Sequence, residues 1–197
     1  MLKKELKPKF LSNLLRLGSN NDGGYLVEKN SLQNSTILLS FGLGYNWSFE
    51  KDFYKNRKIP IVCYDSTVTY SSIKKYSIKH LGSFFFRIFK YKYFSKKGFF
   101  SEMLNKILLF KDYRDFFKGD IRHIKKDIAL GKDSLYLKDI IKELNSEEKI
   151  FLKIDIEGAE YRLLNEIINF QDKISGLIIE FHNLDLNIDN VYSFIDK

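Results

Sequence analysis

Short apolar runs bounded by turn residues alternate along most of this chain with segments of helical periodicity. The runs predict buried strands over 36–41, 59–64, 150–156 and 174–181, with a weaker strand over 121–129. Apolar residues at helical spacing predict helices over 47–54, 137–144, 159–168 and 188–195, and a short basic helix is expected within 1–17. Strands that alternate with helices indicate βαβ units, so the expected fold is α/β, with a mostly parallel sheet and helices on both of its faces.

Residues suited to a site stand in the last part of the expected strands or directly after them. Because right-handed crossovers place the carboxyl ends of parallel strands along one edge, these residues are expected to surround one crevice. Ligands of open α/β sheets bind at that edge. The residues are Gly42, Gly44, Asp65, Asp127, Asp155, Glu157 and His182.

The strongest of these signals is the segment from Phe151 to Glu160, in which an apolar run stops abruptly at two carboxylates and a glycine. This pattern is typical of a buried parallel strand that delivers acidic side chains to the rim of a sheet. Asp155 and Glu157 are therefore candidates for a binding or catalytic site. For Glu160, and as an alternative for Glu157, the sequence indicates an acid placed favourably at a helix N-terminus.

The expected strand 36–41 leads into a glycine pair, Gly42 and Gly44, and the next strand leads into Asp65. Glycines let the backbone turn tightly and approach a ligand, and an acid at this distance along the chain reaches the ribose of a nucleotide. The set suits a nicotinamide dinucleotide or S-adenosylmethionine, although a Gly-x-Gly pair also occurs in ordinary tight turns. Trp47 stands where the dinucleotide fingerprint has its third glycine, which disfavours a pyrophosphate.

Composition limits the class of protein but does not identify a function. At 197 residues, 44% of them hydrophobic, the chain predicts a single domain over 1–197 in which 70–119 form an insertion or lid. The one cysteine, Cys63, excludes an intramolecular disulfide and suits the cytoplasm. No apolar stretch reaches the roughly 18 residues of a membrane span. The net charge of +8 favours anionic partners.

The insertion after the second strand is rich in aromatic and basic residues between 84 and 117. Three interpretations stay open: a lid whose aromatic side chains pack on one another, a surface that lies peripherally on an acidic membrane, or a platform that stacks nucleobases. Contact with the inner membrane would suit a saccharide acceptor built on a lipid carrier, whereas nucleic acid is not a favoured partner.

Several stretches together resemble the FkbM-type family of S-adenosylmethionine-dependent methyltransferases, which are chiefly O-methyltransferases of sugars and natural products. The resemblance covers both ends of the chain but not the insertion, and its specific part runs from Lys153 to Glu160. The supporting stretches are Arg16-Leu17-Gly18, Asp22-Gly23-Gly24-Tyr25, Leu39 to Gly44, Ser48-Phe49-Glu50, Tyr64 to Thr67 and Ile178 to His182. The resemblance implies a Rossmann-like class I methyltransferase sheet. Because the family's sheet continues past the point where this sequence stops, the C-terminal strands are expected to be missing.

The same resemblance implies a cofactor site at the edge of the sheet. The glycine loop would face S-adenosylmethionine, Asp65 its ribose, Asp127 its adenine and Asp155 its methionine end. Ser40 replaces an acid that many members carry, so Asp22 or Glu50 is expected to supply contacts there, and the turn 22–25 is expected to fold over the cofactor. The residues expected to bind the cofactor are Asp22, Ser40, Phe41, Gly42, Gly44, Glu50, Asp65, Ser66, Asp127 and Asp155.

Methyl transfer to oxygen requires alignment of the acceptor and often the removal of its hydroxyl proton. His182 is the expected base, and Asp155 or Glu157 is the alternative, as base or as the group that orients the acceptor. The carboxylates of Asp155, Glu157 and Glu180 make a divalent metal conceivable. The spacing shows no further oxygen ligands, so a metal is not favoured and no metal ligand is predicted.

The sequence therefore favours an S-adenosylmethionine-dependent O-methyltransferase that acts on a saccharide or related small acceptor, as in surface polysaccharide biosynthesis. One alternative is a nicotinamide-dependent sugar-modifying enzyme, for which Tyr70 and Lys74 have the required spacing but stand straight after the second strand. The other is a non-catalytic protein that binds nucleic acid or membrane on a decayed methyltransferase fold. The sequence determines neither the acceptor nor the oligomeric state.

Overall fold

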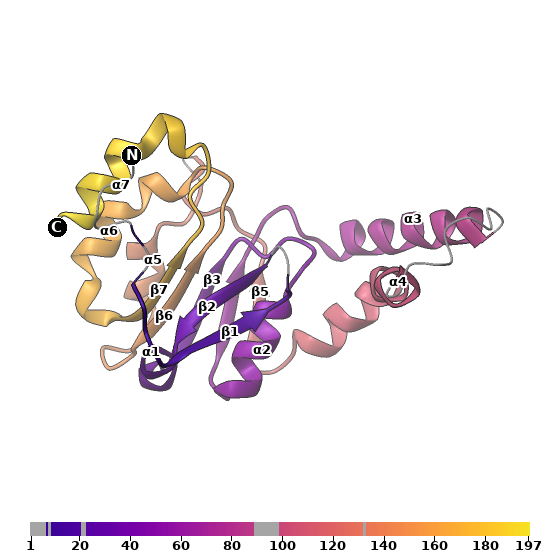
Figure 1. Cartoon of the computed structure of the whole chain (residues 1–197), viewed down its shortest axis with the longest axis horizontal. Coiled ribbons are helices and arrows are strands. Elements are labelled where there is room, and N and C mark those ends of the chain that lie inside the picture. The colour runs from indigo at the N-terminus through magenta and orange to yellow at the C-terminus, as the bar shows by residue number, and fades with distance from the viewer. Residues whose placement is uncertain (1–6, 8, 21–22, 89–98, 132) are drawn as a thin grey trace.

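A five-stranded parallel sheet forms the centre of the protein (Figure 1). The computed structural model describes residue 7 and residues 9–20, 23–88, 99–131 and 133–197. The strands are β3 (Ile37–Phe41), β4 (Ile61–Tyr64), β5 (Ile121–Ile124), β6 (Ile150–Ile154) and β7 (Ile174–Ile179). The predicted α/β class and the predicted strands are thereby confirmed, although β5, β6 and β7 end before the apolar runs do.

The strands lie in the order β5-β4-β3-β6-β7. Counted along the chain from β3, this is third, second, first, fourth, fifth, which is the order of a doubly wound sheet and is compatible with a Rossmann-like fold. The chain leaves β3 toward one side of the sheet and β6 toward the other, so β3 and β6 flank the topological switch point. The backbone N–H of Asp155, just past β6, donates to the carbonyl of Phe41 at 2.8 Å. The loops after these two strands therefore start side by side.

Helices cover both faces of the sheet because successive strand residues point to opposite sides. Leu39 and Phe41 of β3 belong to one apolar core, and Leu38 between them belongs to the other. The first core is covered by α5 (Leu137–Lys142), η3 (Glu160–Arg162), α6 (Leu164–Asn169) and α7 (Leu184–Ile195). The second is covered by β1 (Leu14–Gly18), β2 (Gly24–Glu28), α1 (Lys29–Asn34) and α2 (Ser48–Asn56). A short helix, η4 (Gln171–Lys173), leads into β7.

The helix expected within 1–17 is wrong over its described part, because Leu14–Gly18 forms β1 and pairs antiparallel with β2. Alternation explains the strand: Leu17 is buried at 1% exposure whereas its neighbour Arg16 is exposed. Pairing with β2 then satisfies the backbone groups along one edge of β1, which an isolated strand would leave without partners in the protein. The spacing of the leucines is compatible with a helix as well as with a strand, and pairing with β2 decides for the strand.

The predicted insertion after β4 is helical and consists of α3 (Tyr70–Ile88) and α4 (Phe99–Phe116). The two helices form an arm that projects away from the sheet (Figure 1). The base of the arm is anchored, since Trp47 donates its indole N–H to Asp112 at 2.8 Å and packs edge-on against Tyr113. Residues 89–98 of the insertion lie outside the described residues. None of the described helices combines the length and apolar character needed to cross a membrane.

Candidate functional site

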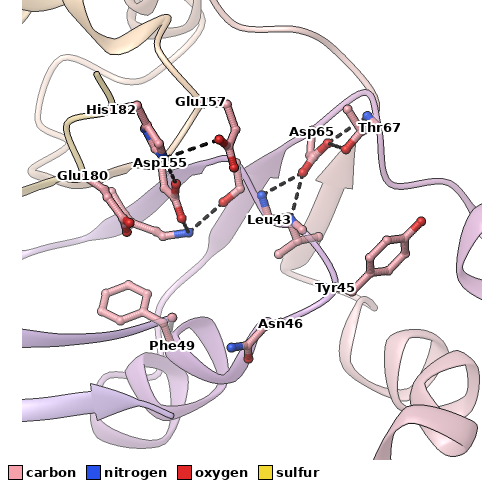
Figure 2. A pocket seen from close by; sticks show the side chains of 14 residues that line it. Leu43, Tyr45, Asn46, Phe49, Asp65, Thr67, Asp155, Glu157, Glu180 and His182 are labelled. Carbon is pink, nitrogen blue, oxygen red and sulfur yellow. Dashed lines mark hydrogen bonds and ion pairs between the residues drawn. The ribbon is translucent and has the colours of Figure 1, made fainter. Parts of the chain in front are cut away.

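A cavity of about 390 Å³ opens at the carboxyl edge of the sheet, next to the switch point. Its volume falls within the ~300–1,000 Å³ that is usual for small-molecule sites. The loops after β3 and β6, the end of β7 and the turn of the β1–β2 hairpin all contribute to its walls (Figure 2). The residues predicted at strand ends that meet there are Gly42, Gly44, Asp65, Asp155, Glu157 and His182.

A second cavity of about 120 Å³ adjoins the first and shares Gly42, Asp65 and Asp155 with it. Asp127 and Ser66 line this smaller cavity, and the hydroxyl of Ser66 donates to the Asp127 carboxylate. Asp127 stands three residues past the end of β5, in a loop, because the strand predicted over 121–129 stops at Ile124. The two predicted cofactor residues therefore lie beside the main pocket, at the β4–β5 side of the sheet.

The first residue of the glycine loop has no alternative to glycine. Gly42 has φ +81°, and a Cβ built there would stand 1.6 Å from the carbonyl oxygen of Asp155. That oxygen belongs to the backbone after β6, so it cannot give way without moving the strand. At Gly44 the demand is only conformational, since φ is +56° and a Cβ would meet nothing within 4 Å. The first glycine therefore serves the packing of two strands, whereas the second leaves open space beside the pocket.

Asp65 closes the glycine loop from the end of β4. Its Oδ2 accepts the backbone N–H groups of Leu43 and Gly44, both at 2.9 Å. Its Oδ1 accepts the N–H and the hydroxyl of Thr67, at 2.8 and 2.6 Å, and the N–H of Val68 at 3.2 Å. Burial by itself would raise the pKa of Asp65, but these hydrogen bonds outweigh it and hold the pKa below its usual range.

These bonds use the acceptor capacity of the Asp65 carboxylate, which amounts to about four lone-pair sites. Asp65 follows β4 and lines the pocket beside the glycine loop, and its contact with a ribose stays a prediction. Because these hydrogen bonds occupy the Asp65 carboxylate, a ribose hydroxyl can bind it only if a bond to the glycine loop or to Thr67 is released, a requirement that the sequence did not suggest.

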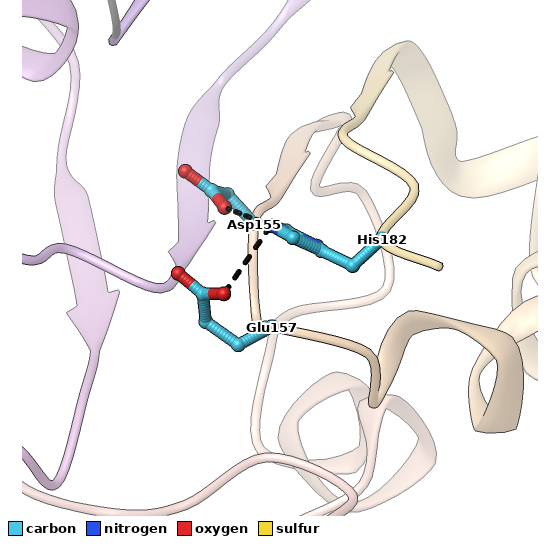
Figure 3. A group of neighbouring side chains, drawn as sticks. All are labelled: Asp155, Glu157 and His182. Carbon is cyan, nitrogen blue, oxygen red and sulfur yellow. Dashed lines mark ion pairs between the residues drawn. The ribbon is translucent and has the colours of Figure 1, made fainter. Parts of the chain in front are cut away.

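On the opposite wall, His182 faces two carboxylates (Figures 2 and 3). Its Nε2 lies 3.7 Å from Oδ1 of Asp155 and 3.5 Å from Oε2 of Glu157. One ligand atom from each of the three residues can be chosen so that all lie within 4.8 Å of one another, a spacing that is compatible with a metal ion. The prediction that Asp155, Glu157 and His182 meet at one crevice is confirmed, whereas their roles as acid or base stay predictions.

Tyr25 reaches this wall from β2. Its hydroxyl lies 2.8 Å from Oε2 of Glu180 and 3.1 Å from Oδ2 of Asp155. Burial raises the pKa of the phenol well above its usual range, and the two carboxylates raise it further. The phenol therefore stays protonated and donates its hydrogen to the acids. Gly23 of the same turn lines the pocket, whereas Asp22 lies outside the described residues.

Lys153 lies at the base of the pocket, and the sequence did not single it out as a site residue. Its ammonium donates to the Gly42 carbonyl at 2.7 Å and lies 3.7 Å from Oε1 of Glu50 and 4.0 Å from Oδ2 of Asp155. The side chain is only 5% exposed. A lysine inside an otherwise apolar strand run was the signal that could have identified it, because charged groups are rarely buried without a partner.

Three predicted cofactor residues, Ser40, Phe41 and Glu50, are fully buried and are not among the residues that line the two cavities. The Ser40 hydroxyl donates to Oε1 of Glu50 at 2.6 Å, and this oxygen also faces Lys153. The other oxygen of Glu50 has no hydrogen-bond partner among the described residues. These residues therefore support Lys153 and the glycine loop from within the core.

Comparisons of the chain with models of known protein families, with curated proteins and with solved structures found no match. The resemblance of the sequence motifs to a methyltransferase family therefore stays a prediction, and a functional proposal has to rest on the geometry of the pocket.

Proposed function

We propose that the protein is an S-adenosylmethionine-dependent O-methyltransferase that acts on a saccharide or a related small hydroxyl compound. The observation that carries the proposal is the charge of the pocket next to the glycine loop. Among the described residues, four carboxylates line it, those of Asp65, Asp155, Glu157 and Glu180. Lys153 is the one lysine of the lining in the same part of the chain, and it is already bound to Gly42 and adjacent to Glu50.

An acidic pocket favours a cationic ligand over an anionic one. S-adenosylmethionine carries a sulfonium, an ammonium and a carboxylate group and is positive overall, whereas NAD carries two phosphate charges and one cationic nicotinamide ring and is negative overall. A pyrophosphate also requires a free helix N-terminus at the glycine loop. Here the first turn of α2 holds the acid Glu50, whose charge is offset by Lys153, so this helix N-terminus brings no additional positive group to a pyrophosphate. The charge distribution therefore supports the sulfonium cofactor over the dinucleotide.

The residues of the pocket fit this cofactor in two further respects. Gly44 lines the cavity, and the space that a Cβ would occupy there is open, so a ligand can approach the backbone. Asp155 and Glu180 offer carboxylate oxygens that can accept from an ammonium group. When bound, S-adenosylmethionine supplies a methyl group on a positively charged sulfur that a nucleophilic oxygen can displace.

The wall formed by Asp155, Glu157 and His182 suits a polyhydroxyl acceptor. Carboxylates accept hydrogen bonds from neighbouring hydroxyl groups, and they disfavour acceptors that carry phosphate or carboxylate groups. His182 then takes the proton of the hydroxyl that is methylated, because Nε2 lies at the pocket. A neutral saccharide satisfies both requirements.

Calorimetric titration of S-adenosylmethionine into the wild type tests the proposal, with NAD as the competing ligand. We expect micromolar binding of S-adenosylmethionine and none of NAD. Asp65→Ala should weaken binding by at least ~10-fold, because it opens the glycine loop and removes a charged acceptor. Asp172→Ala is the matched control, since Asp172 is exposed and lies before β7, at the other edge of the sheet. Preferential binding of NAD, or equal binding by the Asp65 variant, would refute the proposal.

A further inference from the structure

Glu160 lies directly behind His182 and is fully buried, at 0% exposure. Its Oε1 accepts the backbone N–H of His182 at 2.6 Å, and its Oε2 accepts the N–H of Gly158 at 2.8 Å. The same Oε1 lies 3.3 Å from Nδ1 of the His182 ring. Glu160 follows β6 and His182 follows β7, so the contact joins two neighbouring strand ends. This arrangement is more specific than the acid at a helix N-terminus that the sequence indicated.

Both oxygens of Glu160 accept backbone N–H groups, so the carboxylate presents an acceptor to the ring nitrogen that faces it. In a neutral imidazole one nitrogen carries the proton and the other carries a lone pair. Nδ1 lies within hydrogen-bond distance of the fully buried Glu160 carboxylate, at 3.3 Å, whereas the carboxylates near Nε2 are more exposed and farther away, at 3.5 and 3.7 Å; in a neutral ring the proton is therefore on Nδ1. The lone pair is then on Nε2, which is the nitrogen that faces Asp155 and Glu157 in the pocket.

The surroundings also fix the orientation of the histidine. The hydroxyl of Tyr161 donates to the His182 carbonyl at 2.6 Å, and the Tyr161 ring stacks on Phe181 with centroids 5.5 Å apart. The next residue, Asn183, has φ +49°, which turns the chain sharply into α7. Both the N–H and the carbonyl of His182 are therefore hydrogen-bonded, to Glu160 and Tyr161. In the ring, Nδ1 faces one carboxylate and Nε2 faces two.

We propose that Glu160 is a positioning residue that holds His182 as the Nδ1–H tautomer, so that Nε2 is the base for the acceptor hydroxyl. This inference rests on the proposed function. In the step it serves, the O–H bond of the acceptor breaks, the proton bonds to Nε2, and the electron pair stays on the acceptor oxygen. The imidazolium that forms keeps its Nδ1–H directed at Glu160.

Nitrogen NMR of the imidazole rings tests the positioning without any ligand. The chain has three histidines, so His182→Gln assigns the signals of the site. At a pH where the ring is neutral, we expect a pyrrole-type signal for Nδ1 and a pyridine-type signal for Nε2. The reverse tautomer in the wild type would overturn the proposal whether or not the Glu160 variants fold.

Two variants of Glu160 separate positioning from general support of the fold. Glu160→Gln offers one carbonyl oxygen in place of two carboxylate oxygens, so we expect loss of the pure Nδ1–H tautomer. Glu160→Asp keeps the carboxylate, and we expect it to retain more of that tautomer. The matched control is Glu157→Gln, which alters a neighbour of Nε2 and should leave Nδ1 protonated. A folded Glu160→Gln protein with the wild-type tautomer would overturn the proposal.

Two ligands complete the test. S-adenosylmethionine should bind Glu160→Gln with unchanged affinity, because Glu160 is not among the residues that line the two cavities. A loss of both the tautomer and the binding in this variant would make Glu160 part of the cofactor site and overturn its positioning role. Millimolar Mn²⁺ that selectively broadens the His182 signals would mark Asp155, Glu157 and His182 as a cation site and overturn the role of Nε2 as base. A wild type with the expected tautomer that binds no S-adenosylmethionine would refute the proposed function, and the proton transfer with it, but not the positioning.

Discussion

Replacement of Lys153 by methionine tests how the base of the pocket is held together. Lys153 and Glu50 form a pair whose side chains are 5% and 0% exposed. Lys153→Met keeps the volume and removes the charge. It leaves a buried carboxylate that retains the Ser40 hydroxyl but has no cation, and it leaves the Gly42 carbonyl without its donor.

Breaking one side of a buried ion pair costs about 3–5 kcal/mol, because the remaining charge stays out of water. Such a loss is a large fraction of the ~5–15 kcal/mol by which domains are usually stable. Replacement of both partners should cost less than the lysine replacement alone. We expect Glu50→Gln combined with Lys153→Met to recover about 2 kcal/mol of the loss, since no uncompensated charge remains.

Urea unfolding followed by tryptophan fluorescence measures these changes. Trp47 is the one tryptophan and is 2% exposed in the core beside α2, so its emission reports on loss of the fold. A shift in the urea midpoint reports a change in stability only if the slope of the unfolding free energy against urea concentration stays the same in the variant and the wild type. Lys55→Met is the matched control, because Lys55 pairs with Asp52 at 71% and 34% exposure, and such surface pairs contribute up to about 1 kcal/mol. A loss at Lys153 no larger than at Lys55, or strict additivity with Glu50→Gln, would contradict the reasoning.

Three further predictions concern the glycine loop and its surroundings. Gly42→Ala should lower the free energy of unfolding by roughly 3–5 kcal/mol, because the added Cβ collides with the backbone after β6. Gly44→Ala should cost only the ~1–2 kcal/mol of a left-handed conformation. Urea unfolding compares the two variants, and equal losses would contradict the close contact between Gly42 and the backbone after β6. Asp65→Asn places an amide against the backbone donors of the loop and should cost about 2–3 kcal/mol in the same assay, a prediction that a shift below that of Gly44→Ala would contradict. Burial lowers the pKa of His123, so at mildly acidic pH the folded protein binds fewer protons than the unfolded chain. The stability that the neutral ring contributes is therefore complete above about pH 6.5, the usual pKa of histidine. It is lost by at most ~1.4 kcal/mol per pH unit as the pH falls. Urea midpoints at neutral and mildly acidic pH should therefore diverge less in His123→Gln than in the wild type, and an identical pH dependence of both proteins would refute this assignment.

The strands of the sheet and the acids at their ends were predictable because both depend on short-range patterns. An apolar run bounded by turn residues has few ways to bury itself, and a parallel sheet aligns the ends of its strands. Asp65, Asp155 and His182 therefore come together at one pocket as the sequence indicated. The cofactor, the acceptor and the reaction stay predictions.

The first strand shows why other features could not be predicted. The leucines before Gly18 fit a helix as well as a strand, and the choice depends on pairing with β2. Tyr25 is a similar case, since its hydroxyl meets Asp155 130 residues later and Glu180 155 residues later. No local pattern in either segment records such a contact.

By itself, the sequence determined the α/β class, the approximate position of each strand of the sheet and the edge at which polar groups gather. Only the tertiary structure decided what each polar group bonds to. It directs the Asp65 oxygens to the glycine loop, pairs Lys153 with Glu50 inside the core, and places Glu160 behind His182. The physical reason is that secondary structure follows the periodicity of neighbouring residues, whereas the partner of a buried charge depends on which distant segment folds against it.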